Sequence, residues 1–277
     1  MEPTKFWIKT QKKKDLFAWF VTPASTPKAV VILVHGYGEH SWRYLGWAEK
    51  FVNSGYAFLS WDHQGHGLSD GQRGHIPSYS YFLDEVDLTI DKAAEFFPDV
   101  PIVLYGHSMG GNIAINYALS NRKSIKYLIA TSPWLRLAKP ASLLVNSILG
   151  IFRALLPMMP FMAPVKPNDT SKIPDAVERY KTDPLIHNRL TPSLYFSIKN
   201  AGEYAIANGS KLTMPFLLMH GDADRITSCQ ASKQLSQSCP NVEFVKWPNQ
   251  YHEMHNDTAS NELFLKIEQW LDERIGV

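Results

Sequence analysis

Short, nearly continuous apolar runs alternate with longer amphipathic stretches along most of the chain. Apolar runs of this kind are typical of strands that are buried on both faces, and the stretches between them have helical spacing. The pattern therefore predicts an α/β fold in which helices flank a mostly parallel central sheet. Strands are predicted at 29–36, 56–62, 102–108, 125–132, 216–222 and 242–248, after an opening hairpin at 5–9 and 15–22. Helices are predicted at 42–53, 79–97, 108–120, 228–238 and 258–274.

The alternation fails once, between residues 134 and 209, where Pro and Met are frequent and no strand pair is predicted. We interpret this segment as a helical cap inserted into a single core domain, whose two parts are residues 1–133 and 210–277.

The cap contains an apolar stretch between Lys139 and Lys166 that is long enough to span a bilayer. Arg153 lies near its centre, and a central arginine costs about 2.5–3.5 kcal/mol on insertion scales. We therefore expect a lid rather than a transmembrane helix. Residues 142–165 hold more apolar side chains than one core-facing stripe needs, which favours contact with an acyl chain or a membrane surface.

Composition narrows the function classes. Lys and Arg total 28 against 26 Asp and Glu, which argues against binding to nucleic acid. Two cysteines, Cys229 and Cys239, are too few for a disulfide framework. The N-terminal residues lack the apolar core of a secretory signal, so we expect a cytoplasmic protein, peripheral to membranes through its cap.

The sharpest motif is Gly-His-Ser-Met-Gly at residues 106–110, between a predicted strand and a predicted helix. This context is the one in which Gly-x-Ser-x-Gly holds a nucleophilic serine in a tight turn. Ser108 is thus the candidate nucleophile, and it requires a histidine base and an acid to orient that base.

Both partners follow predicted strands further along the chain. Asp222 and Asp224 come after the strand at 216–222, and His252 and His255 come after the strand at 242–248. Since open parallel sheets build their sites at the carboxyl ends of strands, these residues are candidates, but spacing alone does not choose within either pair.

A tetrahedral oxyanion needs two N–H donors, one from the residue after the nucleophile and one from the loop after the third strand. Met109 supplies the first, and we expect the second from Tyr37 in the Gly-rich turn at 35–38.

Several motifs together resemble the monoglyceride lipase and lysophospholipase family of the α/β-hydrolase superfamily. They are HGYGEHSWRY at 35–44, DHQGHGLSDGQRGH at 62–75, GHSMGG at 106–111, HGDADRI at 220–226 and YHEMH at 251–255. The resemblance covers the core and excludes most of the cap.

The resemblance implies that Asp224 is the acid and His252 the base. It also maps a polar cluster near the leaving alcohol onto Glu39, Arg43 and His255. Some of these lipases carry a reactive cysteine where this chain has Thr227.

We therefore expect a serine esterase that cleaves monoacylglycerols to fatty acid and glycerol through an acyl-enzyme. A lysophospholipase or broad carboxylesterase is the alternative, followed by a catalytically silent hydrolase-fold binding protein. No cofactor is implied. No metal is expected either, because the histidines and aspartates at 62–75 match no metal signature.

Overall fold

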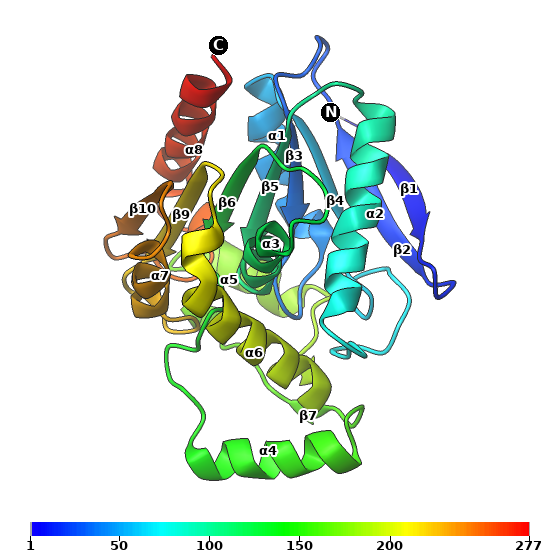
Figure 1. The fold of residues 1–277 in the computed structure, drawn as a ribbon, viewed down its shortest axis with the longest axis vertical. Coiled ribbons are helices and arrows are strands. Elements are labelled where there is room, and N and C mark those ends of the chain that lie inside the picture. The colour runs from blue at the N-terminus through cyan, green and yellow to red at the C-terminus, as the bar shows by residue number, and fades with distance from the viewer. Residues whose placement is uncertain (1, 277) are drawn as a thin grey trace.

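The computed structural model describes residues 2–276, and at its centre is an eight-stranded sheet (Figure 1). The strand order is β1-β2-β4-β3-β5-β6-β9-β10. β2 runs antiparallel to both of its neighbours, and all other neighbouring pairs are parallel. The bounds are Thr4–Lys9 (β1), Asp15–Val21 (β2), Val30–Val34 (β3), Ala57–Trp61 (β4), Ile102–His107 (β5), Tyr127–Thr131 (β6), Phe216–Gly221 (β9) and Val242–Trp247 (β10). The predicted hairpin and the six predicted strands are confirmed.

Each inner strand sends alternate side chains into two separate hydrophobic cores, one on each face of the sheet. In β3, for example, Val30 and Ile32 enter one core while Val31 and Leu33 enter the other. The first core is covered by α2 (Ser80–Phe96), α3 (Met109–Ser120), α6 (Pro192–Asn208) and α7 (Cys229–Ser236). The second is covered by α1 (Leu45–Asn53) and α8 (Ser260–Ile275). Helices lie on both faces because parallel neighbours can be joined only by crossover connections.

The five predicted helices are present, with one difference at a helix start. The first turn of the helix predicted at 42–53 is a separate 3-10 turn, η1 (Ser41–Tyr44). Its first residue is held from outside the helix, because the backbone N–H and the hydroxyl of Ser41 both donate to Asp62 Oδ1 at 2.7 Å. The other 3-10 turns are η2 (Pro167–Asp169), η3 (Gly209–Lys211) and η4 (Met254–Asn256).

The expectation that residues 134–209 contain no strand pair is wrong. β7 (Phe161–Met162) and β8 (Arg189–Leu190) pair antiparallel. A two-residue strand is too short to show the alternation that identifies longer strands in a sequence. The pairing is stabilised by contacts distant in sequence, since Leu190 is buried in the first core and Phe161 packs against that core.

The cap has an outer part and an inner part. Its outer helix, α4 (Leu143–Leu155), has no buried residue and lies at the lower edge of Figure 1, where its Asn146 is bonded to Tyr195 of α6 at 3.0 Å. In the sequence, α5 (Pro174–Thr182) lies between α4 and α6. The inner helix α6 packs on α3, where the Asn116 amide donates to the Ala201 carbonyl at 3.1 Å. Among residues 2–276, no helix combines the length and the apolar character needed to cross a membrane.

Two glycines test this division of the cap. A Cβ atom on Gly202 of α6 would lie 2.1 Å from the Leu135 carbonyl oxygen, whereas a Cβ on Gly150 of α4 would meet no atom within 4 Å. We expect Gly202→Ala to lower the free energy of unfolding by about 3 kcal/mol through overpacking. Gly150→Ala should raise it by about 0.5–1 kcal/mol, since alanine favours a helix interior. Urea denaturation of both variants checks this, and equal effects would contradict the close packing of α6.

Candidate active site

Ser108 occupies a strained turn between β5 and α3. Its backbone has φ 55° and ψ −117°, in a region that non-glycine residues rarely adopt. The glycines on either side permit the turn. A Cβ on Gly106 would lie 2.2 Å from the Gly110 oxygen, and a Cβ on Gly110 would lie 1.9 Å from the Val34 oxygen. Backbone segments thus pass so close to positions 106 and 110 that only glycine fits there, and the resulting turn fixes the position of the serine hydroxyl.

The structure brings Ser108, His252 and Asp224 together from three loops at the carboxyl ends of β5, β10 and β9. His252 Nε2 lies 2.9 Å from Ser108 Oγ, and His252 Nδ1 lies 2.7 Å from Asp224 Oδ2. Because a carboxylate only accepts, the proton on Nδ1 points to Asp224 and leaves Nε2 free to accept from the serine hydroxyl. This arrangement lets the imidazole remove a proton from Ser108.

The electrostatics favour a charged acid and a strong base. Burial alone would raise the pKa of Asp224, but the adjacent His252 and a hydrogen bond from His220 hold it well below its usual range. Burial alone would lower the pKa of His252, but Asp224 outweighs burial and raises it above 6.5.

Two side chains that the sequence did not assign to the site also contact the acid. His220 Nε2 lies 3.2 Å from Asp224 Oδ2, and the Thr227 hydroxyl donates to the same oxygen at 2.8 Å. The Ser232 hydroxyl lies 2.8 Å from His220 Nδ1, which fixes the imidazole with its proton on the Asp224 side. Their positions in the motif, four residues before the acid and three after it, were the only available signal.

Asp222 and His255, the alternatives that spacing left open, lie outside the hydrogen-bonded series of Ser108, His252 and Asp224. Asp222 Oδ1 accepts the backbone N–H of Asn249 at 2.7 Å and so braces a loop. His255 is buried with its ring 4.7 Å from that of Tyr44, and neither of its nitrogens has a partner among the described residues. Burial lowers the pKa of His255 to about 4 and keeps it neutral.

The expected oxyanion donors flank the serine. Met109 is the first residue of α3, so its N–H has no partner within the helix. On the other side, the Gly36 N–H donates to Glu39 Oε1 at 2.6 Å, which leaves the next amide, that of Tyr37, as the candidate. The loop passes close to the serine, because a Cβ on Gly36 would lie 3.2 Å from the Ser108 Cβ.

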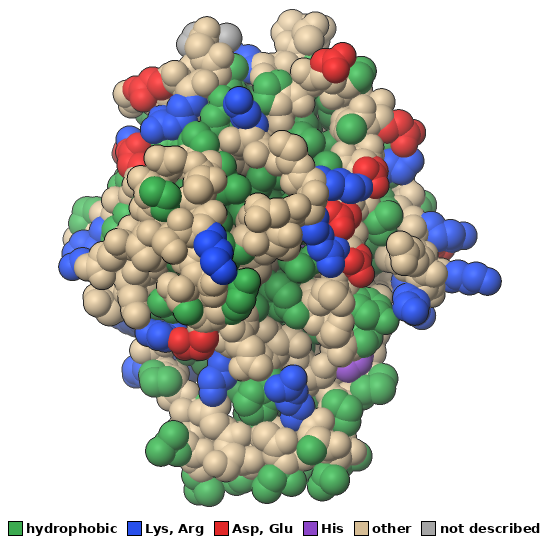
Figure 2. Space-filling view, in the orientation of Figure 1, with side chains coloured by type: hydrophobic (Ala, Val, Ile, Leu, Met, Phe, Trp, Pro, Cys, Tyr) green, Lys and Arg blue, Asp and Glu red, His purple; other side chains and the backbone are tan. Residues whose placement is uncertain are grey.

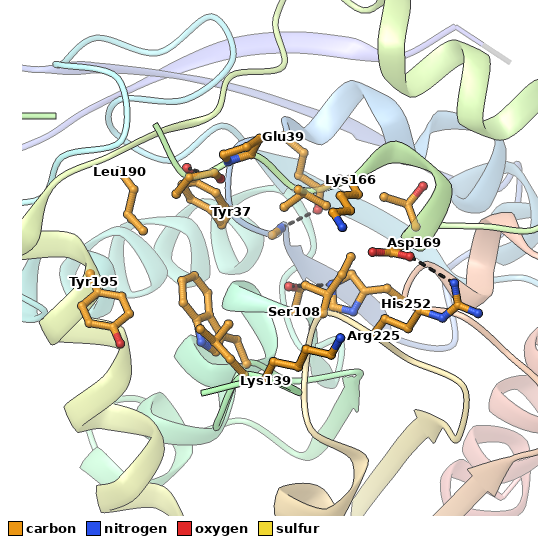
Figure 3. A pocket seen from close by; sticks show the side chains of 18 of the residues that line it. Tyr37, Glu39, Ser108, Lys139, Lys166, Asp169, Leu190, Tyr195, Arg225 and His252 are labelled. Atoms are coloured by element: carbon orange, nitrogen blue, oxygen red, sulfur yellow. Dashed lines mark hydrogen bonds and ion pairs between the residues drawn. The ribbon is translucent and has the colours of Figure 1, made fainter. Parts of the chain in front are cut away.

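A cavity of about 680 Å³ opens above Ser108 and His252 (Figure 3). Apolar side chains from the cap and the core form much of its wall: Tyr37, Trp134, Leu137, Val145, Leu149, Phe161, Leu190, Tyr195 and Ile226. Glu39 and Arg43 also line it, but His255 does not. His255 is thus not a lining residue, although the charges of Glu253 and Arg43 act on it, and its place in the polar cluster stays a prediction.

Glu253 joins Glu39 and Arg43 in the wall and was not singled out from the sequence. The Arg43 guanidinium bonds both carboxylates, at 2.5 Å to Glu39 Oε2 and at 2.7 Å to Glu253 Oε2. Burial favours a higher pKa for Glu253, yet Arg43 lowers it to about 2. Glu253 directly follows His252 in sequence, so this ion pair anchors the loop that carries the base.

The histidines at 63–75 do not gather around an empty coordination site. His63 Nδ1 lies 2.5 Å from Glu85 Oε2, and both Asp62 carboxylate oxygens accept backbone N–H groups. Among residues 2–276, no group of three or more His, Cys, Asp or Glu side chains has a geometry suited to a metal ion.

Comparison with known proteins gives consistent similarities. The family model described as "Serine aminopeptidase, S33" matches residues 25–259. An uncharacterized abhydrolase domain-containing protein of Dictyostelium discoideum is 33% identical over 96% of this chain, which spans only 28% of that protein. The monoglyceride lipase of Homo sapiens is 31% identical, with 94% of this chain and 87% of that protein covered. The crystal structure of the monoacylglycerol lipase of Paleococcus ferrophilus has a TM-score of 0.83 at 29% identity, with 98% of each chain covered.

The geometry predicts how the reactivity of Ser108 depends on pH. Ser108 needs neutral His252, whose pKa lies above 6.5 because Asp224 stabilises the imidazolium. The rate of labelling by a fluorophosphonate should therefore fall as the pH drops, with a midpoint above pH 6.5.

The same measurement separates the two aspartates. Asp224→Asn should slow labelling by about 10³–10⁴-fold and lower the midpoint, since the group that raises the pKa of His252 is gone. Asp222→Asn is the matched control and should change neither value. A reversed ranking, or a rate that does not depend on pH, would contradict the assignment.

Proposed function

The chain belongs to the serine aminopeptidase S33 family and is a serine hydrolase of the esterase and lipase type, and we propose that it cleaves monoacylglycerols to fatty acid and glycerol. The observation that carries the proposal is the hydrogen-bonded series Ser108–His252–Asp224 at the base of a largely apolar pocket. The similarity to monoglyceride lipases over nearly the whole chain supports the choice of substrate.

In the proposed reaction, Ser108 Oγ attacks the ester carbonyl while His252 Nε2 takes the hydroxyl proton. The Tyr37 and Met109 amides donate to the oxyanion of the tetrahedral intermediate, and Asp224 stabilises the imidazolium. The bond to the glycerol oxygen then breaks, and His252 gives its proton to that oxygen. Water, deprotonated by His252, attacks the resulting acyl-enzyme and releases the fatty acid, which restores Ser108.

The wall of the pocket suits a molecule with one apolar and one polar end. Val145, Leu149, Phe161 and Leu190 would surround the acyl chain, and each buried methylene contributes about 0.8 kcal/mol. Glu39 and Arg43 would receive the glycerol hydroxyls. His255 lies behind this wall, so we assign it to packing against Tyr44 rather than to substrate.

Peptide substrates fit this pocket less well, although the family description names an aminopeptidase. A free peptide amine needs an unpaired carboxylate. The carboxylates among the described lining residues are Glu39, Asp169 and Glu253, and each forms an ion pair with an arginine.

We further propose that residues 134–209 act as a lid whose outer helix contacts a lipid surface. Figure 2 shows hydrophobic side chains along the edge of the molecule where α4 lies. Leu143 is 87% exposed and Leu155 is 73% exposed, and the apolar residues that follow α4 are also exposed. An exposed apolar patch of this kind is typical of a surface that meets protein or lipid.

Removal of the nucleophile tests the proposed function. Ser108→Ala should abolish hydrolysis of a monoacylglycerol, and it should leave the melting temperature nearly unchanged because the substitution removes one oxygen atom. Activity above about a thousandth of the wild-type kcat would reject Ser108 as the nucleophile. The assay is release of fatty acid, with melting followed in parallel.

Vesicle binding tests the lid. The wild-type protein should co-sediment with vesicles, and the double variant Phe152→Ser/Leu155→Ser should bind less because it loses apolar area on α4. The control, Trp7→Ser/Leu265→Ser, removes side chains of similar exposure from β1 and α8 and should bind like wild type. Wild-type protein that stays in the supernatant would rule out the proposed contact.

A further inference from the structure

The first part of the cap, residues 134–168, contains basic but no acidic side chains. No Asp or Glu occurs between Asp99 and Asp169, whereas Lys139, Arg153 and Lys166 all fall within that interval. The net charge of the whole chain is only +2, so the imbalance is local. Positive charge is therefore concentrated on the segment that covers the pocket.

Part of this charge lies at the mouth of the pocket. Lys139, Lys166 and Arg225 line the cavity together with a single nearby acid, Asp169, and we call these three cations the cationic rim. In Figure 3, Asp169 and Arg225 lie on the opposite side of Ser108 from Leu190 and Tyr195. This charged pair thus lies across the reactive serine from part of the apolar wall.

The rim carries unbalanced charge. Neither Lys139 nor Lys166 forms an ion pair with any residue in the described part of the chain. Arg225 Nη1 lies 3.4 Å from Asp169 Oδ1, and its guanidinium lies 4.9 Å from the Tyr251 ring centroid. Three cations against one carboxylate leave an excess of two positive charges.

The deeper polar cluster offsets part of this excess. Its single cation, Arg43, is shared by Glu39 and Glu253, so the whole wall holds four cations against three carboxylates and keeps an excess of one positive charge, which lies at the rim. A substrate with its ester at Ser108 and its glycerol at Glu39 would direct its next substituent outward. The group that meets the cationic rim is therefore the substituent on the distal glycerol hydroxyl.

We propose that this site prefers single-chain glycerolipids that carry an anionic phosphate on the distal hydroxyl. The inference rests on the proposed function and specifies the headgroup. The reaction is the same hydrolysis. The acyl carbon–oxygen bond breaks, water supplies OH to the acyl group and H to the glycerol oxygen, and the phosphate ester remains intact on the released alcohol.

Charge distinguishes this class from its competitors. A neutral glycerol leaves the two rim lysines without a partner, and the ammonium of a choline headgroup is repelled by the rim. A phosphate monoester offers several acceptor oxygens to lysine and arginine donors, which form short charge-assisted hydrogen bonds with it. Since the rim is exposed to water, the attraction is screened by salt.

The test compares monoacylglycerol, its 3-phosphate and lysophosphatidylcholine of equal acyl length, each presented as monomers below its micelle concentration. For wild-type protein at low ionic strength, kcat/KM for the phosphate lipid should exceed that for the monoacylglycerol by about tenfold. The ratio should fall as salt is added. In the triple variant Lys139→Gln/Lys166→Gln/Arg225→Gln, the ratio should fall toward one.

A matched triple variant, Lys12→Gln/Lys13→Gln/Lys14→Gln, removes the same charge from the exposed turn between β1 and β2. It should keep the wild-type ratio, and an equal loss in this control would attribute the preference to overall charge and overturn the proposal. A wild-type ratio of one or less would overturn it as well, while leaving the proposed function intact.

Two further outcomes show whether the rim cations bind a bilayer instead of the substrate, and whether the proposed function itself holds. Suppose the rim variant loses binding to vesicles of phosphatidylglycerol and phosphatidylcholine but keeps the substrate ratio. The cations then bind the anionic surface of a bilayer rather than the substrate, and the proposal fails. If the wild-type protein cleaves neither the monoacylglycerol nor its phosphate, the proposed function itself is wrong.

Discussion

The site depends on the compensation of one buried negative charge. The Asp224 side chain is fully buried, and an ion in that position costs several kcal/mol unless donors surround it. The backbone N–H groups of Ile226 and Thr227 donate to Oδ1, while the Thr227 hydroxyl, His220 and His252 approach Oδ2. These donors come from β9, from the loop after it and from the loop after β10. Satisfying the carboxylate therefore holds in place the loops that present the base.

Much of the fold and the central triad of side chains could be predicted because their signals are local. Strands such as β3 are continuous apolar runs, and Ser108 lies in a five-residue motif with a strand before it and a helix after it. The α/β-hydrolase fold and the family predicted from these motifs are confirmed. The choice of Asp224 over Asp222 needed the family resemblance, because the two residues differ only in which loop atoms they meet after folding.

What escaped prediction is decided by contacts between segments far apart in the sequence. β7 and β8 are two residues each, and their pairing depends on packing against the core rather than on any periodic pattern. Glu253 matters because Arg43, more than two hundred positions earlier, lies within hydrogen-bonding distance. The stacking of His255 on Tyr44, two hundred positions earlier, likewise has no signal in the local sequence.

Because α4 has no buried residue, folding stability and the shape of the cavity constrain its sequence separately. The helix is attached to the body by a few contacts, such as Leu149 on the first core and Asn146 with Tyr195, so apolar substitutions at its other positions are nearly neutral for stability. Val145 and Leu149 of the same helix nevertheless line the cavity. Mutational drift in this helix can therefore reshape the cavity at little cost in stability, which makes α4 the natural starting point for evolving new preferences.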